Sequence, residues 1–196
     1  MKKGQIIFLN GVSSTGKSSL SRKLQERLSE PYHWLNVDEF ISFTDMRKHP
    51  STYFEKGKDP VSLFPHVVKL YSDMGVNVIA DVAFMKWIGP RMFMAEETFT
   101  NCVEMLSDYP IMYVHVTCPY KEVRRRHEER GNRGEELGLD YGDETLVGDT
   151  DGIYDLVVNT HSETLDECAD RIIKKLASES EFNAFRKIKA SKVQSS

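Results

Sequence analysis

The stretch Gly11-Val12-Ser13-Ser14-Thr15-Gly16-Lys17-Ser18 matches the pattern G-x-x-x-x-G-K-S/T. Its glycines can take backbone angles that a Cβ would forbid, and they let the chain come close to phosphate. The backbone N–H groups of such a loop surround an anion at the start of a helix. Lys17 would reach the β- and γ-phosphates, and the Ser18 hydroxyl would bind Mg²⁺. The stretch, together with the adjoining Ser19, therefore predicts a binding loop for ATP·Mg²⁺.

The residues on both sides of this loop have the order that its mechanism requires. Ile6–Leu9 is a short apolar run rich in β-forming residues, which predicts a buried strand. After the loop, the leucines of residues 18–28 recur every four positions and predict an amphipathic helix. A strand, a phosphate loop and a helix in this order are typical of a nucleotide-binding α/β domain.

The rest of the chain alternates between short apolar runs and helical spacing. The further strands that we expect are 34–37, 76–80, 111–116 and 153–158. The further helices that we expect are 38–46, 61–74, 91–107, 119–130 and 162–176, with an exposed loop at 47–60 and a mobile loop at 131–152. This alternation predicts an α/β fold of three layers, with a five-stranded parallel sheet covered on both faces.

The length of 196 residues fits one domain, which we place at residues 1–180. Residues 181–196 are polar and rich in lysine, and we expect a frayed C-terminal tail unless Phe182 and Phe185 dock on the domain. The net charge of −4 and the mixing of basic residues with glutamate argue against nucleic acid as a partner. No apolar stretch is long enough for a membrane span, and three scattered cysteines favour a reducing cytoplasm over a disulfide framework or zinc site. The oligomeric state stays open, a homo-oligomer included.

Two aspartates follow predicted strands, at the edge of a parallel sheet where ligands bind. Asp38 follows the second strand and is our candidate for the base that accepts the substrate hydroxyl proton. Asp81 follows the third strand and is our candidate for the metal shell or for orienting the substrate. Either aspartate could instead be a helix N-cap, where Asp is common. Glu39 directly follows Asp38 and is an alternative base.

Arginines gather on the predicted helix at 119–130 and just beyond it. Arg126 and Arg130 are four residues apart and share a helix face, and Arg133 follows the helix end at Gly131. Their guanidinium groups suit the neutralisation of charge on a transferring phosphoryl group. A solvated face, with glutamates paired along the helix, is the alternative. Behind a phosphate loop we favour the functional interpretation and predict an arginine-containing lid at about 119–152.

These segments together resemble the chloramphenicol phosphotransferase family and related small P-loop kinases, from about Ile6 to Leu176. The segments that carry the resemblance are Phe8–Ser18, Asn36-Val37-Asp38, Val78–Val82, Arg126-x-x-x-Arg130-Gly131-Asn132-Arg133, Tyr154–Thr160 and Glu167-Cys168-Ala169. Two positions depart from the family pattern, which often has a double aspartate at Asp81 and usually has Asp at position 132. Residues 42–75, which should line the acceptor pocket, match the family poorly.

The resemblance implies a cytoplasmic phosphotransferase that uses ATP and Mg²⁺ and acts on a hydroxyl of a small molecule. It implies Asp38 as the base, three arginines as lid or phosphate contacts (Arg126, Arg130 and Arg133), and Thr160 near the adenine. One alternative is a zeta-toxin-like kinase of sugar nucleotides. Another is an ATP-binding sensor or ATPase without a small-molecule acceptor. A guanine-specific protein is disfavoured because the N/T-K-x-D segment is absent.

Overall fold

The computed structural model describes residues 2–43, 59–84, 95–130, 152–178 and 181–193. Five parallel strands form one sheet in the order β2-β3-β1-β4-β5. They are β1 (Ile6–Asn10), β2 (His33–Asn36), β3 (Val78–Val82), β4 (Ile111–Thr117) and β5 (Leu156–Asn159). The predicted five-stranded parallel sheet is confirmed, and the strand that precedes the glycine-rich loop lies at its centre.

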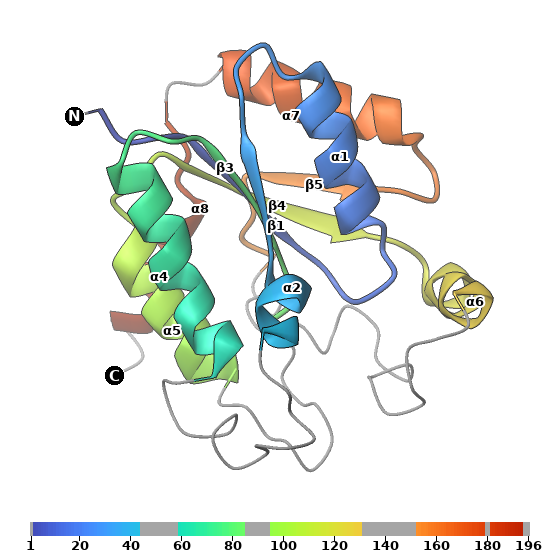
Figure 1. Ribbon diagram of the computed structural model, residues 1–196, viewed down its shortest axis with the longest axis horizontal. Coiled ribbons are helices and arrows are strands. Elements are labelled where there is room, and N and C mark those ends of the chain that lie inside the picture. The colour runs from blue at the N-terminus through green and yellow to red at the C-terminus, as the bar shows by residue number, and fades with distance from the viewer. Residues whose placement is uncertain (1, 44–58, 85–94, 131–151, 179–180, 194–196) are drawn as a thin grey trace.

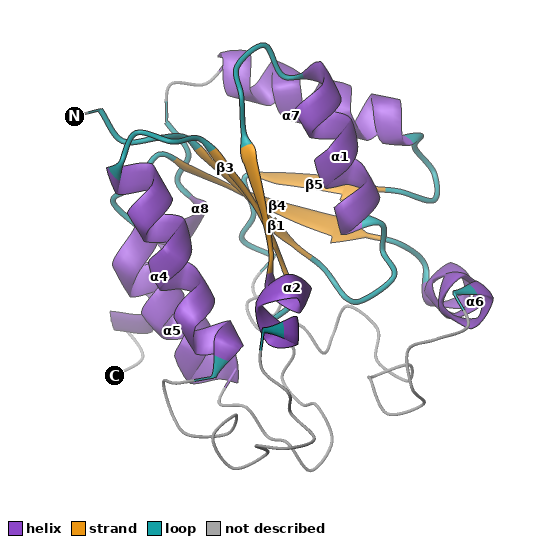
Figure 2. Cartoon of the chain, in the orientation of Figure 1, coloured by secondary structure: helices purple, strands orange, loops and turns teal. Residues whose placement is uncertain are grey.

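Helices cover both faces of the sheet (Figures 1 and 2). One face packs against α1 (Lys17–Arg27) and α7 (Leu165–Ser178). The other face packs against α4 (Pro60–Asp73), α5 (Ala95–Leu106) and α8 (Ala184–Val193). Two short helices, α2 (Val37–Ser42) and α6 (Tyr120–Glu129), follow the carboxyl ends of β2 and β4. The result is the expected fold of three layers, and in the described parts of the chain no helix is both long and apolar enough to cross a membrane.

The C-terminal residues differ from the expectation of a frayed tail, because residues 184–193 form helix α8. Phe185 is 1% exposed and packs its ring against those of Phe8, Phe99 and Tyr113. The structure thus has the alternative in which Phe185 docks on the domain. The polar composition of the segment hid an apolar face, which a ten-residue helix needs only a few residues to form.

Several element boundaries also differ from the sequence-based ones. β3 continues through Asp81 to Val82, because its backbone pairs with β1 as far as Asn10. β5 begins at Leu156 rather than at residue 153. Helix α7, expected at 162–176, begins at Leu165. It follows a reciprocal pair in which Thr164 N–H donates to the Glu167 carboxylate and Glu167 N–H donates to the Thr164 hydroxyl.

One predicted loop and one predicted helix need correction, and other predicted segments lie outside the described residues. Asp59 was expected in an exposed loop, but it is 5% exposed and its carboxylate caps α4 by accepting from Ser62 N–H at 2.9 Å. The expected helix at 38–46 is α2, which ends at Ser42. Residues 44–58, 91–94 and most of the predicted lid, 131–151, lie outside the described part of the chain.

Candidate active site

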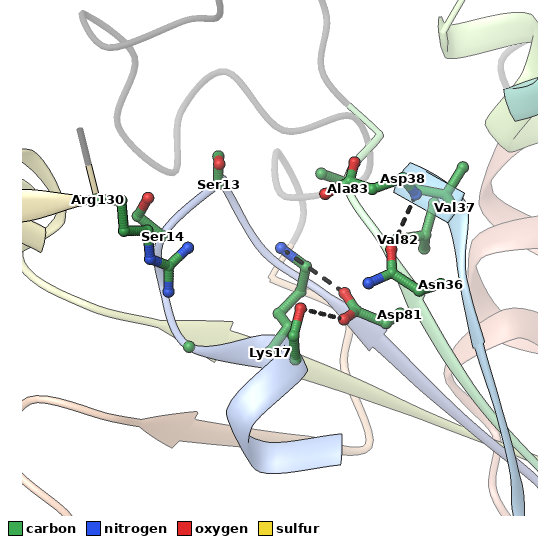
Figure 3. A pocket seen from close by; sticks show the side chains of 12 residues that line it. Ser13, Ser14, Lys17, Asn36, Val37, Asp38, Asp81, Val82, Ala83 and Arg130 are labelled. Carbon is green, nitrogen blue, oxygen red and sulfur yellow. Dashed lines mark hydrogen bonds and ion pairs between the residues drawn. The ribbon is translucent and has the colours of Figure 1, made fainter. Parts of the chain in front are cut away.

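A pocket opens at the carboxyl ends of the central strands, where β1 leads into the glycine-rich loop (Figure 3). It lies between that loop, the end of β3 and the first turn of α2. Its lining residues are Ser13, Ser14, Gly16, Lys17, Ser18, Asn36, Val37, Asp38, Asp81, Val82, Ala83 and Arg130. The structure thus brings the predicted loop, both candidate carboxylates and one predicted arginine to a single site.

The loop has the backbone conformation of an anion nest. Gly16 has a φ of 98° and Ser14 a φ of 66°, both in the left-handed region. Gly11 is required for a different reason, since a Cβ there would lie 2.3 Å from the carbonyl oxygen of Val116. A left-handed conformation costs a residue with a side chain about 1–2 kcal/mol. Ser14 therefore stores backbone strain within the loop.

Lys17 lies over the loop from the first turn of α1. Its Nζ donates hydrogen bonds to the carbonyl oxygens of Gly11 at 2.9 Å and Val12 at 3.1 Å. The same Nζ is 4.0 Å from Oδ1 of Asp81, and both side chains are almost fully buried. The ammonium group is thus held at the mouth of the loop, where phosphate oxygens can replace the carbonyls as its acceptors.

Ser18 and Asp81 form a pair of oxygen ligands next to this ammonium group. The Ser18 hydroxyl donates to Oδ2 of Asp81 at 2.8 Å. Burial raises the pKa of the Asp81 carboxyl, while the Lys17 charge and the Ser18 hydrogen bond act in the opposite direction. A hydroxyl and one carboxylate fit Mg²⁺, which prefers oxygen ligands and keeps several waters or phosphate oxygens. Within the described ranges, no three His, Cys, Asp or Glu side chains gather as a closed metal site.

Asp38 stands across the pocket from the loop, in the first turn of α2. It is not the N-cap of that helix. The cap is Asn36, whose side-chain oxygen accepts from the Asp38 backbone N–H at 2.8 Å. Glu39 is exposed and is not among the residues that line the pocket, so the geometry favours Asp38 over Glu39 as the candidate base.

The predicted arginines have different places. Arg130 lines the pocket together with Ser14 (Figure 3). Arg126 does not line it; its guanidinium donates to the hydroxyl and the carbonyl of Thr160 at 2.9 and 3.0 Å. Arg133 lies outside the described residues. The neighbouring Arg124 and Arg125 form exposed ion pairs along α6, as expected for a solvated face.

Sequence reasoning missed two features of this site. Asn36 lies two residues before Asp38, a spacing typical of an N-cap and the backbone it caps, and this local signal could have found it. Val82 and Ala83 line the pocket through the end of β3, which the sequence-based boundary placed beyond the strand. Neither residue carries a chemical signal of its own, so only the strand register reveals them.

Solved structures with a similar fold include kinases of several kinds. The APS kinase of Mycobacterium tuberculosis, solved with AMPPNP and APS, has 17% identity and a TM-score of 0.60, over 91% of this chain and 100% of that one. A sugar kinase from Janibacter has 15% identity and a TM-score of 0.58, over 89% and 95% of the two chains. The deoxyadenosine kinase of M. mycoides has 19% identity and a TM-score of 0.54, over 89% and 100%. At such identities these likenesses show the fold alone.

A comparison with curated proteins found no match to this sequence. The family model described as chloramphenicol phosphotransferase-like protein matches residues 4–177, which is most of the chain. This match covers the glycine-rich loop, both carboxylates and the arginine helix. Together with the fold it supports a P-loop kinase. The chain belongs to the chloramphenicol phosphotransferase-like family.

Proposed function

We propose that this protein is an ATP-dependent phosphotransferase that moves the γ-phosphate of ATP to a hydroxyl of a small molecule. The observation that carries the proposal is the placement of Lys17, the Ser18–Asp81 pair and Asp38 around one pocket. A phosphate-binding ammonium, a pair of metal ligands and a carboxylate opposite them are the parts that phosphoryl transfer to a hydroxyl requires.

In this mechanism the acceptor oxygen forms a bond to the γ-phosphorus while the bond to the β–γ bridging oxygen breaks. ADP leaves with the bonding electron pair, and the hydroxyl proton passes to the Asp38 carboxylate. Ser18 and Asp81 would hold Mg²⁺, which when bound neutralises charge on the β- and γ-phosphates. Lys17 and Arg130 steady the transferring group, with Arg133 as a further candidate. The loop amides from Gly11 to Ser19 hold the phosphate chain.

The position of Asp38 across the pocket from the loop fits a kinase, because a kinase needs a carboxylate within reach of an incoming hydroxyl. An ATPase would use the same carboxylate to position water, so the response to hydroxyl compounds separates the two functions. A sugar-nucleotide kinase would use the same parts with a larger acceptor. The acceptor class is therefore the quantity to measure.

The test is ADP release from ATP·Mg²⁺ in the presence of chloramphenicol, nucleosides, sugars and UDP-sugars, for wild type, Asp38→Asn and Glu39→Gln. We expect one acceptor class to stimulate turnover in wild type and in Glu39→Gln, and not in Asp38→Asn. Asp38→Asn should still bind ATP with near wild-type affinity. Loss of ATP binding together with transfer in Asp38→Asn would contradict its assignment as the base. Bound ATP with no stimulation by any compound would favour the sensor.

A further inference from the structure

Two side chains converge on the backbone of the phosphate loop from the side opposite Asp81. The hydroxyl of Thr160, which follows β5, donates to the carbonyl oxygen of Thr15 at 2.5 Å. Arg126, from α6, donates to that same hydroxyl at 2.9 Å and to the Thr160 carbonyl at 3.0 Å. A longer contact of 3.5 Å joins Arg126 to the Thr15 carbonyl itself. Segments more than 100 residues apart thus meet at one peptide carbonyl.

That carbonyl belongs to the peptide unit between Thr15 and Gly16. In a trans peptide the C=O and the following N–H point in opposite directions, and no cis peptide occurs among the described residues. The Thr15 carbonyl points to Thr160, so the Gly16 N–H points away from it. Gly16 lines the phosphate pocket, whereas Thr15 and Thr160 do not. Holding the carbonyl therefore directs an N–H of the nest toward the phosphates.

This peptide unit needs such a restraint. Gly16 has a φ of 98° and no side chain, so the barrier that usually keeps a peptide plane in one orientation is low here. Thr160 is only 9% exposed, and its side chain lies 3.5 Å from the place where a Gly16 Cβ would be. A rotated peptide would leave the Thr15 carbonyl facing the anion and the Thr160 hydroxyl without its acceptor.

The restraint continues outward as a chain of charged and polar groups. The Glu122 carboxylate accepts from Arg126 at 2.8 Å, and hydrogen bonds from Arg125 and Arg126 lower the pKa of Glu122 to about 2. The hydrogen-bonded chain therefore runs from the Glu122 carboxylate through the Arg126 guanidinium and the Thr160 hydroxyl. It ends at the Thr15 carbonyl and the Gly16 amide of the same peptide unit. Hydrogen bonds in such a chain polarise one another, which strengthens the final N–H as a donor to an anion.

We propose that Thr160 and Arg126 are positioning residues that hold the Thr15–Gly16 peptide in its phosphate-binding orientation. Their ligand class, through Gly16, is the oxyanions of a polyphosphate chain. The inference rests on the proposed function, since it assigns work at the same pocket. This role differs from a position beside the adenine. A residue that holds the phosphate loop affects ligands with and without an adenine ring equally, whereas a residue that contacts the adenine affects only ATP.

Inorganic tripolyphosphate is the probe that separates these roles, since it has the phosphates of ATP and no base. Binding of tripolyphosphate and of ATP, each with Mg²⁺, would be measured by calorimetry for wild type, Thr160→Val and Thr160→Ser. Valine keeps the shape of threonine and lacks the hydroxyl, while serine keeps the hydroxyl. We expect Thr160→Val to weaken the binding of both ligands by a similar factor, about three- to tenfold for the loss of one hydrogen bond. Thr160→Ser should bind both ligands with near wild-type affinity.

Two neighbouring arginines on α6 provide a matched control. Arg126→Gln should weaken tripolyphosphate binding at least as much as Thr160→Val. Arg125→Gln removes the same charge from a residue that also contacts Glu122. Arg125 does not touch Thr160 in the described contacts, so the affinity of this variant for tripolyphosphate should stay near that of wild type. Thermal unfolding of each variant checks that the fold is intact.

The outcomes are distinct. If Thr160→Val weakened ATP binding but left tripolyphosphate binding unchanged, the positioning role would be overturned. Thr160 would then be assigned to contact with the adenine ring. Equal losses in Arg125→Gln and Arg126→Gln would reduce the effect to general charge and also overturn it. A wild-type protein that binds neither ligand would overturn the proposed function as well.

Discussion

The Ser18 hydroxyl donates a hydrogen bond of 2.8 Å to Oδ2 of Asp81, which joins the first turn of α1 to the end of β3. The two oxygens belong to elements that are far apart in sequence, and the parallel register of β1 and β3 brings them together. A pair formed before any ligand arrives costs little reorganisation when phosphates and metal bind. The Asp81 carboxylate of this pair is buried, and burial disfavours its charged form in the free protein.

Asp81→Asn should raise the stability of the free protein and weaken its use of Mg²⁺. Asparagine keeps the shape and removes a charge that burial disfavours by more than the nearby Lys17 charge and the Ser18 hydrogen bond favour it. We expect the unfolding free energy to rise, and each 1 kcal/mol of gain would raise Tm by about 2–4 °C for a domain of this size. Thermal unfolding measures the gain, and a Mg²⁺ titration of ATP binding should show at least a tenfold weaker dependence on the metal. A fall in Tm would contradict this account.

The stability gain of Asp81→Asn should depend on pH. The folded state raises the pKa of Asp81 above its ordinary value of 3.8, so the folded protein binds this proton more tightly than the unfolded chain does. Stability from this group is complete below that value and is lost as pH rises through the folded pKa. The difference in Tm between variant and wild type should therefore be larger at pH 8 than near pH 4. A constant difference would show that the charge of Asp81 is not its cause.

Lys17→Ala should abolish transfer, with the rate falling by at least two to three orders of magnitude as for loss of a charged transition-state contact. Affinity for ATP should also fall, because Lys17 is held beside the loop carbonyls where phosphate would bind. ADP release and calorimetry would measure the two effects. Lys23→Ala, in the same helix but outside the pocket and paired with Glu26, serves as the control and should leave both unchanged.

Ser14→Gly should raise the unfolding free energy by up to about 1 kcal/mol. Glycine relieves the left-handed strain at φ 66° and removes a buried hydroxyl that has no hydrogen-bond partner within the described ranges. Ser13→Gly is the matched control. Ser13 does not share the left-handed conformation, so glycine there should cost about 0.5–1 kcal/mol. Equal shifts of both variants in chemical denaturation would argue against strain at Ser14.

Phe185→Ala should destabilise the protein by about 3–5 kcal/mol, the usual cost of removing a buried aromatic ring. The ring is 1% exposed and contacts three aromatic side chains of the core. Lys187→Ala, in the same helix but exposed, should change stability by less than about 0.5 kcal/mol. Urea denaturation of the two variants would compare them. Similar small effects would mean that α8 is not part of the folding unit.

Local patterns in the sequence predicted the phosphate loop and the five strands. The loop is contiguous, so its eight residues carry the signal together. Asp81 was expected just after β3 and lies within it, but the prediction that it meets the loop held because parallel strands end at one edge. The alternative that Asp38 is the cap of α2 does not hold, because Asn36 is an equally good cap and comes two residues earlier.

Contacts between distant segments could not be predicted in this way. The distant partners of Arg126 are Thr160 and Thr15, which are 34 and 111 residues away. Nothing in the local spacing of Arg126 distinguishes a phosphate contact from a hydrogen bond to the backbone of the loop. Helix α8 was missed since four basic residues outweigh its buried Ala184, Phe185 and Ile188 in any local average. The burial of those three residues depends on β4 and α5, which only the folded chain brings near.

The position of β1 at the centre of the sheet has a consequence for local opening. All five residues of β1 are buried and bonded on both sides, while α2, which carries Asp38, spans only six residues beyond an edge strand. Free energies of local opening follow such differences in packing, so backbone amides of β1 should exchange with solvent only on global unfolding and those of α2 far sooner. On warming, helix α2 with Asp38 should lose its order before the phosphate loop does. The protein should then still bind the phosphates of ATP at temperatures where it no longer transfers the γ-phosphate.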